Sequence, residues 1–115
     1  MGIKMTKHIQ EIGRLAFDAK PEGGRDLQAE QLFDGPFRTV LHIKMRAGAI
    51  LKKHNAPVPI TVLCLSGDGT FLAGADLEDS QELTAGTLIT LEPDVEHDAV
   101  SGSGLHLLVT KFKPS

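Results

Sequence analysis

The sequence predicts an all-β domain of the sandwich or barrel type. Its 115 residues are enough for a single domain, residues 1–115, and too few for two. Clusters of glycine, proline, serine and aspartate interrupt the chain at short intervals, and the pieces between them are too short for ordinary helices. Many of these pieces alternate apolar with polar residues or are rich in β-branched residues, which is typical of strands.

The first segment with a regular pattern is residues 8–17, where Ile9, Ile12 and Ala16 recur at helical spacing. We expect either a short N-terminal helix or an irregular arm there. Strands are expected after it, and the clearest are residues 39–45, 60–65, 88–91 and 105–112.

Two clusters of serine, glycine and aspartate follow or precede these strands, at residues 66–69 and 101–104. Glycine adopts positive φ values at little steric cost, so we expect both clusters to reverse the chain. Asp68 and Gly69 are interpreted in the same way, as turn residues.

Alternation with period 2 predicts which side chains point into the barrel. In residues 39–45, Leu41, Ile43 and Met45 form the apolar face, and His42 is expected on the solvated face between basic residues. In residues 105–112 either face is apolar enough to be inside, so His106 could line an interior pocket.

Residues 60–65 are apolar on both faces. A strand of this kind is covered on both sides, which would occur if its outer face packed against a second subunit. A homodimer is therefore expected.

Charge and composition exclude several functional classes. The net charge is −3, and the nearest approach to a basic cluster is the pair Lys52 and Lys53, so no nucleic-acid partner is expected. The chain has no apolar run of membrane-spanning length and no signal-peptide pattern, and its only cysteine is Cys64. We therefore expect no disulfide framework, no membrane partner and a cytoplasmic location.

Two stretches carry spacings that go beyond the general strand pattern. The first places Gly48, His54, Ala56, Ile60 and Gly67 at intervals of six, two, four and seven residues. The second, GTLITLEPDVEH, begins with a glycine before a strand, passes a proline turn and ends in a histidine. It runs from residue 86 to residue 97.

These stretches resemble the two sequence motifs of the cupin superfamily. The first cupin motif has Gly, five residues, His, one residue, His, three or four residues, Glu, six residues, Gly, and the second has a Gly, a Pro turn and a His. The resemblance covers residues 48–101, about the second half of the chain, and implies a double-stranded β-helix, or jelly-roll, barrel. Small cupins are commonly homodimers, which agrees with the apolar strand at residues 60–65.

The resemblance also implies where a metal site would lie, and the sequence departs from it at two of four positions. His54 and His97 stand where the family has histidine ligands. Ala56 stands at the second histidine and Ile60 at the carboxylate. The turn before His97 is one residue shorter than usual, and Val95 stands where glycine is common.

Two imidazoles fall short of the three protein ligands that catalytic zinc or iron sites usually offer. A third ligand would have to come from His106, Cys64, a nearby carboxylate or a neighbouring chain. The metal, if one binds, would be a single divalent ion such as zinc, iron, manganese or nickel. A lone buried cysteine more often acts as a small hydrophobe than as a ligand.

Two functional hypotheses follow from this pattern. The first is a domain that binds a small-molecule ligand in a mostly apolar pocket, with His54 and His97 near its mouth. Its predicted wall residues are Ala56, Ile60, Val62 and Cys64. The second is a metal-dependent enzyme, an oxygenase or isomerase acting on a small organic acid or an aromatic compound.

Overall fold

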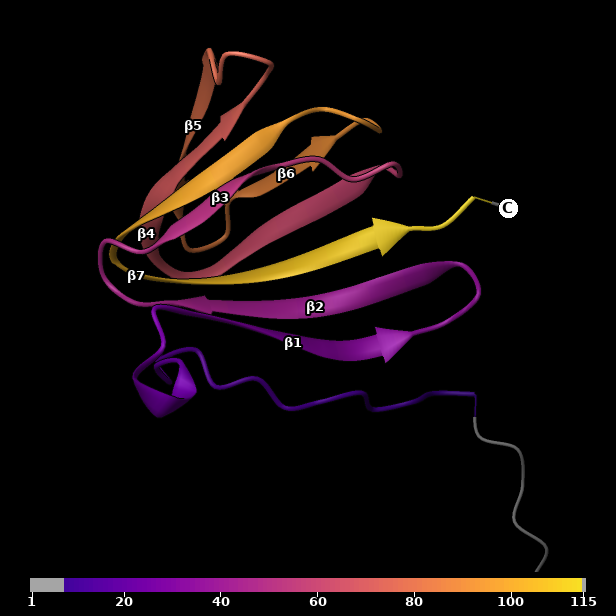
Figure 1. The fold of residues 1–115 in the computed structure, drawn as a ribbon. Helices are drawn as coiled ribbons and strands as arrows, with labels where there is room; N and C mark the ends of the chain where they lie inside the picture. Colours follow the sequence, from indigo (N-terminus) through magenta and orange to yellow (C-terminus); the bar gives the residue numbers. More distant parts are fainter. Residues whose placement is uncertain (1–7, 115) are drawn as a thin grey trace, which may run out of the picture.

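The computed structural model describes residues 8–114. Within this range the chain forms strands and one 3-10 turn, and no α-helix, so the predicted all-β class is confirmed (Figure 1). The elements are η1 (Glu22–Gly24), β1 (Leu27–Asp34), β2 (Arg38–Met45), β3 (Ile50–His54), β4 (Ile60–Ala73), β5 (Asp79–Thr84), β6 (Leu88–Leu91) and β7 (His97–Phe112). No helix in the described residues is long and apolar enough to cross a membrane.

The two longest strands, β4 and β7, form an antiparallel ribbon that organises the rest of the fold. They pair from Ile60 opposite Lys111 to Ala73 opposite His97. The first half of β7 also pairs with β3, and its second half pairs with β2. The first half of β4 also pairs with β6, and its second half pairs with β5. Strand β1 extends the sheet beyond β2. The ribbon doubles back, so that β3 and β5 lie over the layer that contains β1 and β2 (Figure 1).

Glycines bend the ribbon at its middle. Gly67 and Gly104 have φ values of 87° and 136°, and a Cβ atom on Gly67 would collide with the Gly104 carbonyl. The register shifts between Cys64 and Ser66 and again between Asp68 and Gly69. Such bulges bend a strand without ending it.

The prediction that residues 66–69 and 101–104 reverse the chain is therefore wrong. Both clusters lie inside continuous strands and face each other across the ribbon. Asp68 and Gly69 are not turn residues either, because both lie within β4. The Asp68 carboxylate accepts hydrogen bonds across the ribbon from the Ser103 amide at 2.9 Å and the Ser103 hydroxyl at 2.5 Å. The strands predicted at 60–65 and 105–112 are the first half of β4 and the second half of β7.

The core lies between the two layers. Ile43 and Met45 are buried, with 6% and 2% of their surface exposed, as the alternation in β2 predicts. In β7 the structure selects the face of Leu105, Leu107 and Val109 as the inner one. His106 consequently points to the outside of the barrel wall.

Residues 8–20 form an irregular arm, so the helical alternative is wrong and the alternative of an arm is confirmed. The arm passes beneath β1 (Figure 1). Ile9 and Ile12 are 78% and 40% exposed, so the apolar face of such a helix would have had little to pack against. A ten-residue helix without a buried apolar face is marginal in water.

Candidate functional site

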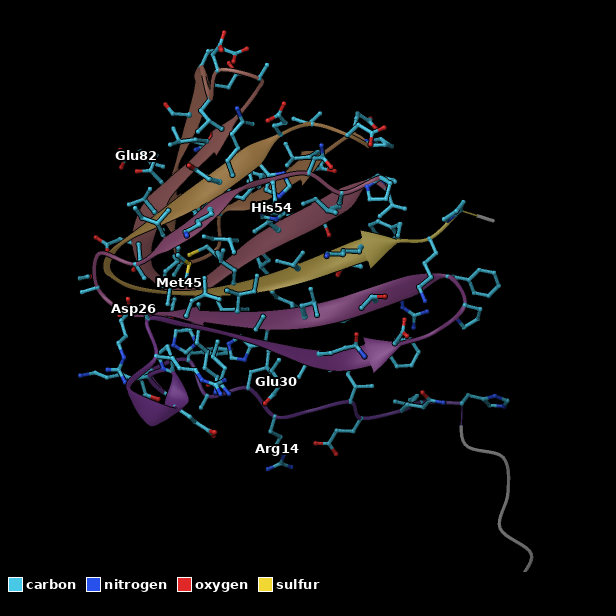
Figure 2. All side chains as sticks on the ribbon, viewed as in Figure 1. Arg14, Asp26, Glu30, Met45, His54 and Glu82 are labelled. Atoms are coloured by element: carbon cyan, nitrogen blue, oxygen red, sulfur yellow. The ribbon has the colours of Figure 1, made fainter. Side chains whose placement is uncertain are left out.

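A cavity of about 170 Å³ lies between the layers, at the end of the barrel where both ends of the β4–β7 ribbon meet. Its wall is mostly aliphatic, and its polar side chains are those of His54, His97 and Lys111. Five of the six predicted pocket residues line it: His54, Ala56, Ile60, Val62 and His97. Figure 2 shows side chains from both layers filling the space between them, with His54 on β3 and Met45 at the end of β2.

Cys64 is the predicted wall residue that does not line the cavity. It points inward, as its parity with Ile60 and Val62 predicts, and is 1% exposed. It lies deeper along β4, where its Sγ contacts the Ser66 carbonyl at 3.6 Å. Burial raises the pKa of the thiol, so Cys64 behaves as a small core residue and not as a nucleophile.

His54 and His97 meet at the mouth of the cavity. His54 ends β3 and His97 begins β7, and the two residues are directly opposite in the ladder. Their ring centroids are 4.2 Å apart in an edge-to-face arrangement of 62°. His97 is 3% exposed and stacks on Phe71 at 5.4 Å, whereas His54 is exposed at the rim.

Backbone carbonyls determine which nitrogen of each ring carries the proton. Nδ1 of His54 is 2.7 Å from the Lys52 carbonyl, and Nδ1 of His97 is 3.0 Å from the Val95 carbonyl. Because a carbonyl only accepts hydrogen bonds, each Nδ1 must donate. Each neutral ring therefore keeps a lone pair on Nε2, the nitrogen that can accept a hydrogen bond or bind a metal.

Burial keeps His97 in this neutral form. Removal from water lowers the pKa of His97 below its ordinary value of 6.5, and the charges of His54 and Lys111 lower it further. The Val95 carbonyl and Asp98 act in the opposite direction without reversing the shift. His97 thus presents an imidazole acceptor, and not an imidazolium donor, near neutral pH.

Two contacts hold the loops that form the mouth. The Asp94 amide donates to the Ala56 carbonyl at 2.7 Å, with Asp94 in the left-handed region at φ 66°. Lys53 and Glu96 form an ion pair at 3.0 Å, although both side chains are about 40% exposed. The hydrogen bond therefore contributes more than the ion pair to placing His97 beside His54.

The donors present do not complete a metal site of the kind the cupin resemblance implies. Ala56 and Ile60, at the positions of the missing ligands, offer no donor atom. No group of three or more His, Cys, Asp or Glu that could hold a metal occurs among residues 8–114. Two imidazoles with free Nε2 atoms are one ligand short of a catalytic centre with three protein ligands.

His106 does not lie beside His54 and His97, because it belongs to the layer of β1 and β2 and points to the outer face of that layer. It is paired with His42, whose Nε2 is 3.0 Å from Nδ1 of His106. The expectation that His42 is solvated is wrong: the residue is 1% exposed. It does point away from the interior, but the N-terminal arm passes over this face, where Phe17, Asp18 and Ala19 lie around His106 and the Ser66 hydroxyl donates to the Phe17 carbonyl.

A wider hollow of about 510 Å³ lies on this outer face, between the arm and the bend of the ribbon. His106 lines it together with Phe17, Lys20 and Arg46. The Arg46 guanidinium donates hydrogen bonds to the Arg25 and Pro21 carbonyls, at 2.6 and 2.9 Å, and so holds the segment around η1 that follows the arm. The interior cavity, with its free imidazole nitrogens, is the better candidate site although it is smaller.

Two residues of this site were missed from sequence. Phe71 lies beyond the strand predicted at 60–65, so its contact with His97 could not be foreseen. Lys111 shares the alternation of Leu105, Leu107 and Val109. That pattern would have placed Lys111 inside once the inner face of β7 was known.

Solved structures with the same architecture identify the fold. An RmlC-like cupin from Desulfovibrio desulfuricans has a TM-score of 0.75 and 16% identity, over 90% of this chain and 95% of that one. An RmlC-like cupin from Shewanella frigidimarina has a TM-score of 0.72 and 20% identity, over 91% and 93% of the two chains. A cupin superfamily protein from Desulfitobacterium hafniense has a TM-score of 0.74 at 8% identity, over 84% of each chain.

The sequence matches no protein-family model, and no curated protein matches it. At such low identities the solved structures establish architecture and not chemistry. The chain has the fold of a small cupin domain, a jelly-roll β-barrel, as its sequence motifs predict.

Proposed function

We propose that this domain binds a small, largely apolar molecule in the cavity between its layers. The observation that carries the proposal is the pair of free Nε2 atoms, on His54 and His97, at the mouth of an aliphatic cavity. Ligand sites are typically apolar concavities with a few polar groups that orient the ligand. The ligand therefore supplies a hydrogen-bond donor, such as a hydroxyl, to an imidazole acceptor.

The volume limits the part of the ligand that is enclosed. A dry apolar cavity of about 150 Å³ accommodates benzene, and the volume here is about 170 Å³. An aromatic ring or a short branched aliphatic group is of the right size. A larger ligand would have to leave most of its surface outside the barrel.

A metal-dependent enzyme is less well supported than a binding domain. It requires a third ligand that the described residues do not place beside His54 and His97. Cys64, the single thiol of the chain, lies outside the cavity. Ligand binding needs only the acceptors and the apolar wall that are present.

Binding can be tested with 3-methyl-1-butanol and its methyl ether, two probes that differ in the hydroxyl donor. We expect the alcohol to shift the amide NMR signals of the cavity residues and the ether to bind more weakly. His97→Ala should reduce this difference between the probes. Ala56→Leu, which narrows the mouth at a loop position, should weaken both. If neither probe perturbs cavity signals, the proposal is wrong.

The homodimer remains a prediction. The outer face of β4 and β6 supports it, because Leu63 lies opposite Leu88 in the ladder and Leu88 is 67% exposed. Light scattering of the purified protein would measure the mass, and Leu88→Asp should give a monomer. A monomeric wild-type protein would contradict the prediction.

A further inference from the structure

The third polar group of the cavity, Lys111, has no role in the proposal above. It lies near the end of β7, opposite Ile60 on β4 and Thr39 on β2. Its side chain lines the same cavity as the two histidines and is half-buried. Lys111 and His97 come from the two ends of β7, which the fold of the ribbon brings together at the mouth.

Lys111 forms no ion pair within residues 8–114. Two other lysines of the described residues do: Lys53 with Glu96 and Lys113 with Asp34. The charge of Lys111 nevertheless acts on the site, because it contributes to lowering the pKa of His97. Among residues 8–114 the cavity lining therefore carries the positive charge of Lys111 and no carboxylate.

The polar and apolar groups are separated along the cavity. His54, His97 and Lys111 are at the mouth, where the strands end. The inner wall includes Val62 and Leu107, which are 1% and 0% exposed. A ligand that satisfies all three polar groups must carry its own polar groups close together at one end, with an apolar group at the other.

Each polar group selects a different part of such a ligand. A neutral imidazole with its lone pair on Nε2 repels a carboxylate and accepts a hydrogen bond from a hydroxyl. An ammonium group attracts a carboxylate, since it only donates hydrogen bonds and forms its strongest ones with carboxylates. The two requirements are met by a hydroxyl and a carboxylate on adjacent carbon atoms.

We propose that the cavity is a site for short 2-hydroxycarboxylates with a branched or aromatic apolar tail. The inference rests on the binding function proposed above. Lys111 pairs with the carboxylate, His54 or His97 accepts the hydrogen bond of the 2-hydroxyl, and the tail packs against Val62 and Leu107. Lys111 thereby determines specificity for an acid over the corresponding neutral molecule.

Two probes isolate the carboxylate. They are 2-hydroxy-4-methylpentanoate and 4-methylpentane-1,2-diol, which share the tail and the 2-hydroxyl and differ in the charged group. Dissociation constants measured by calorimetry or NMR titration should favour the acid by about tenfold, the factor that 1.4 kcal/mol produces. In Lys111→Met the preference for the acid over the diol should disappear.

A matched control is Lys52→Met, which removes the same charge from an exposed position on β3 that does not line the cavity. It should keep the preference for the acid. Equal affinities of the wild-type protein for acid and diol would overturn the carboxylate inference and leave the binding function intact. The inference also fails if Lys111→Met keeps the preference or if Lys52→Met loses it. Binding of neither probe would refute both proposals.

Discussion

Two histidine pairs lie on the two layers of the barrel, one facing the interior and the other facing outward. His54 and His97 join β3 to β7 at the interior cavity, and His42 and His106 join β2 to β7 on the outer face. The pairs differ in what their nitrogens contact. In the inner pair each Nδ1 is bound by a backbone carbonyl and each Nε2 is free, whereas the outer rings are hydrogen-bonded to each other.

This difference separates binding from structure. In the outer pair one nitrogen of each ring is used in the hydrogen bond between the two rings, and Asp18 and Ala19 of the arm lie around His106. This arrangement offers little to a ligand. In the inner pair a backbone carbonyl satisfies Nδ1 of each ring, and Nε2 has no hydrogen-bond partner within residues 8–114, so it remains available to a ligand.

The largest predicted effect is on stability, from the outer pair. His42→Ala removes a side chain that is 1% exposed and leaves a buried ring nitrogen of His106 without its hydrogen-bond partner. We expect a loss of about 3 kcal/mol in the free energy of unfolding, from the cavity and the lost hydrogen bond together. His54→Ala, at an exposed position, should change it by no more than about 0.5 kcal/mol. Urea unfolding measures both, and similar losses would contradict the distinction.

Acidification should destabilise the protein through its buried histidines. Burial is the main cause that lowers the pKa of His42, His97 and His106 below 6.5. Below pH 6.5 the unfolded chain binds protons that the folded chain resists, so stability is complete above this value and falls as the pH falls. The slope reaches at most about 1.4 kcal/mol per pH unit for each histidine.

Urea unfolding at roughly pH 7.5, 6.5 and 5.5 covers this range. The carboxyl groups of Asp34 and Asp68, whose pKa values hydrogen bonds lower from 3.8, affect stability only at more acidic pH. His42→Phe should make the slope shallower because one titrating group is removed. Stability that is constant or increases on acidification would show that these rings are not held neutral.

Metal binding should also distinguish the two histidine pairs, with a smaller effect than the changes in stability. Protein purified without a histidine tag or chelator should contain well below one metal per chain, because two imidazoles lack a third ligand. Added zinc should bind weakly, and His54→Ala or His97→Ala should remove this binding while His106→Asn leaves it unchanged. Elemental analysis and zinc titration are the measurements. Near one metal per chain, lost in both inner-pair variants, would show that a third ligand comes from elsewhere.

The smallest effect concerns the arm that covers the outer pair. The Ser66 hydroxyl donates to the Phe17 carbonyl at a partly exposed position. Ser66→Ala should lower stability by at most about 1 kcal/mol and speed proteolysis within the arm. Ser80→Ala, at an exposed position on β5, is the control and should change neither. If both variants are cut at the wild-type rate, the hydrogen bond does not hold the arm.

The sequence predicted the class of fold because strands and turns leave local signals. Alternation identified Ile43 and Met45 as core residues, and the spacing around His54 and His97 identified the cupin pattern. The sequence prediction failed at the Ser-Gly clusters, because glycines of this kind occur both in turns and at bends within a strand. Only the pairing of β4 with β7 across both clusters separates these outcomes.

His42 shows the second kind of failure. Alternation placed it correctly on the outer face of β2, but an outer face is solvated only if nothing covers it. The covering arm is more than twenty residues away in the sequence, and its irregular backbone has no periodic signal. Burial at this position therefore could not be read from the strand itself.

By itself, the sequence determined strand formation at residues 39–45, 60–65, 88–91 and 105–112, most of the inward-facing residues and the two histidines of the candidate site. These features depend on local alternation and on short spacings along the chain. Tertiary structure alone decided that His54 and His97 are in contact, that His106 lies outside, and that Lys111 lies at the same cavity mouth. Those relations depend on the bend at Gly67 and Gly104, which brings the two ends of the β4–β7 ribbon together.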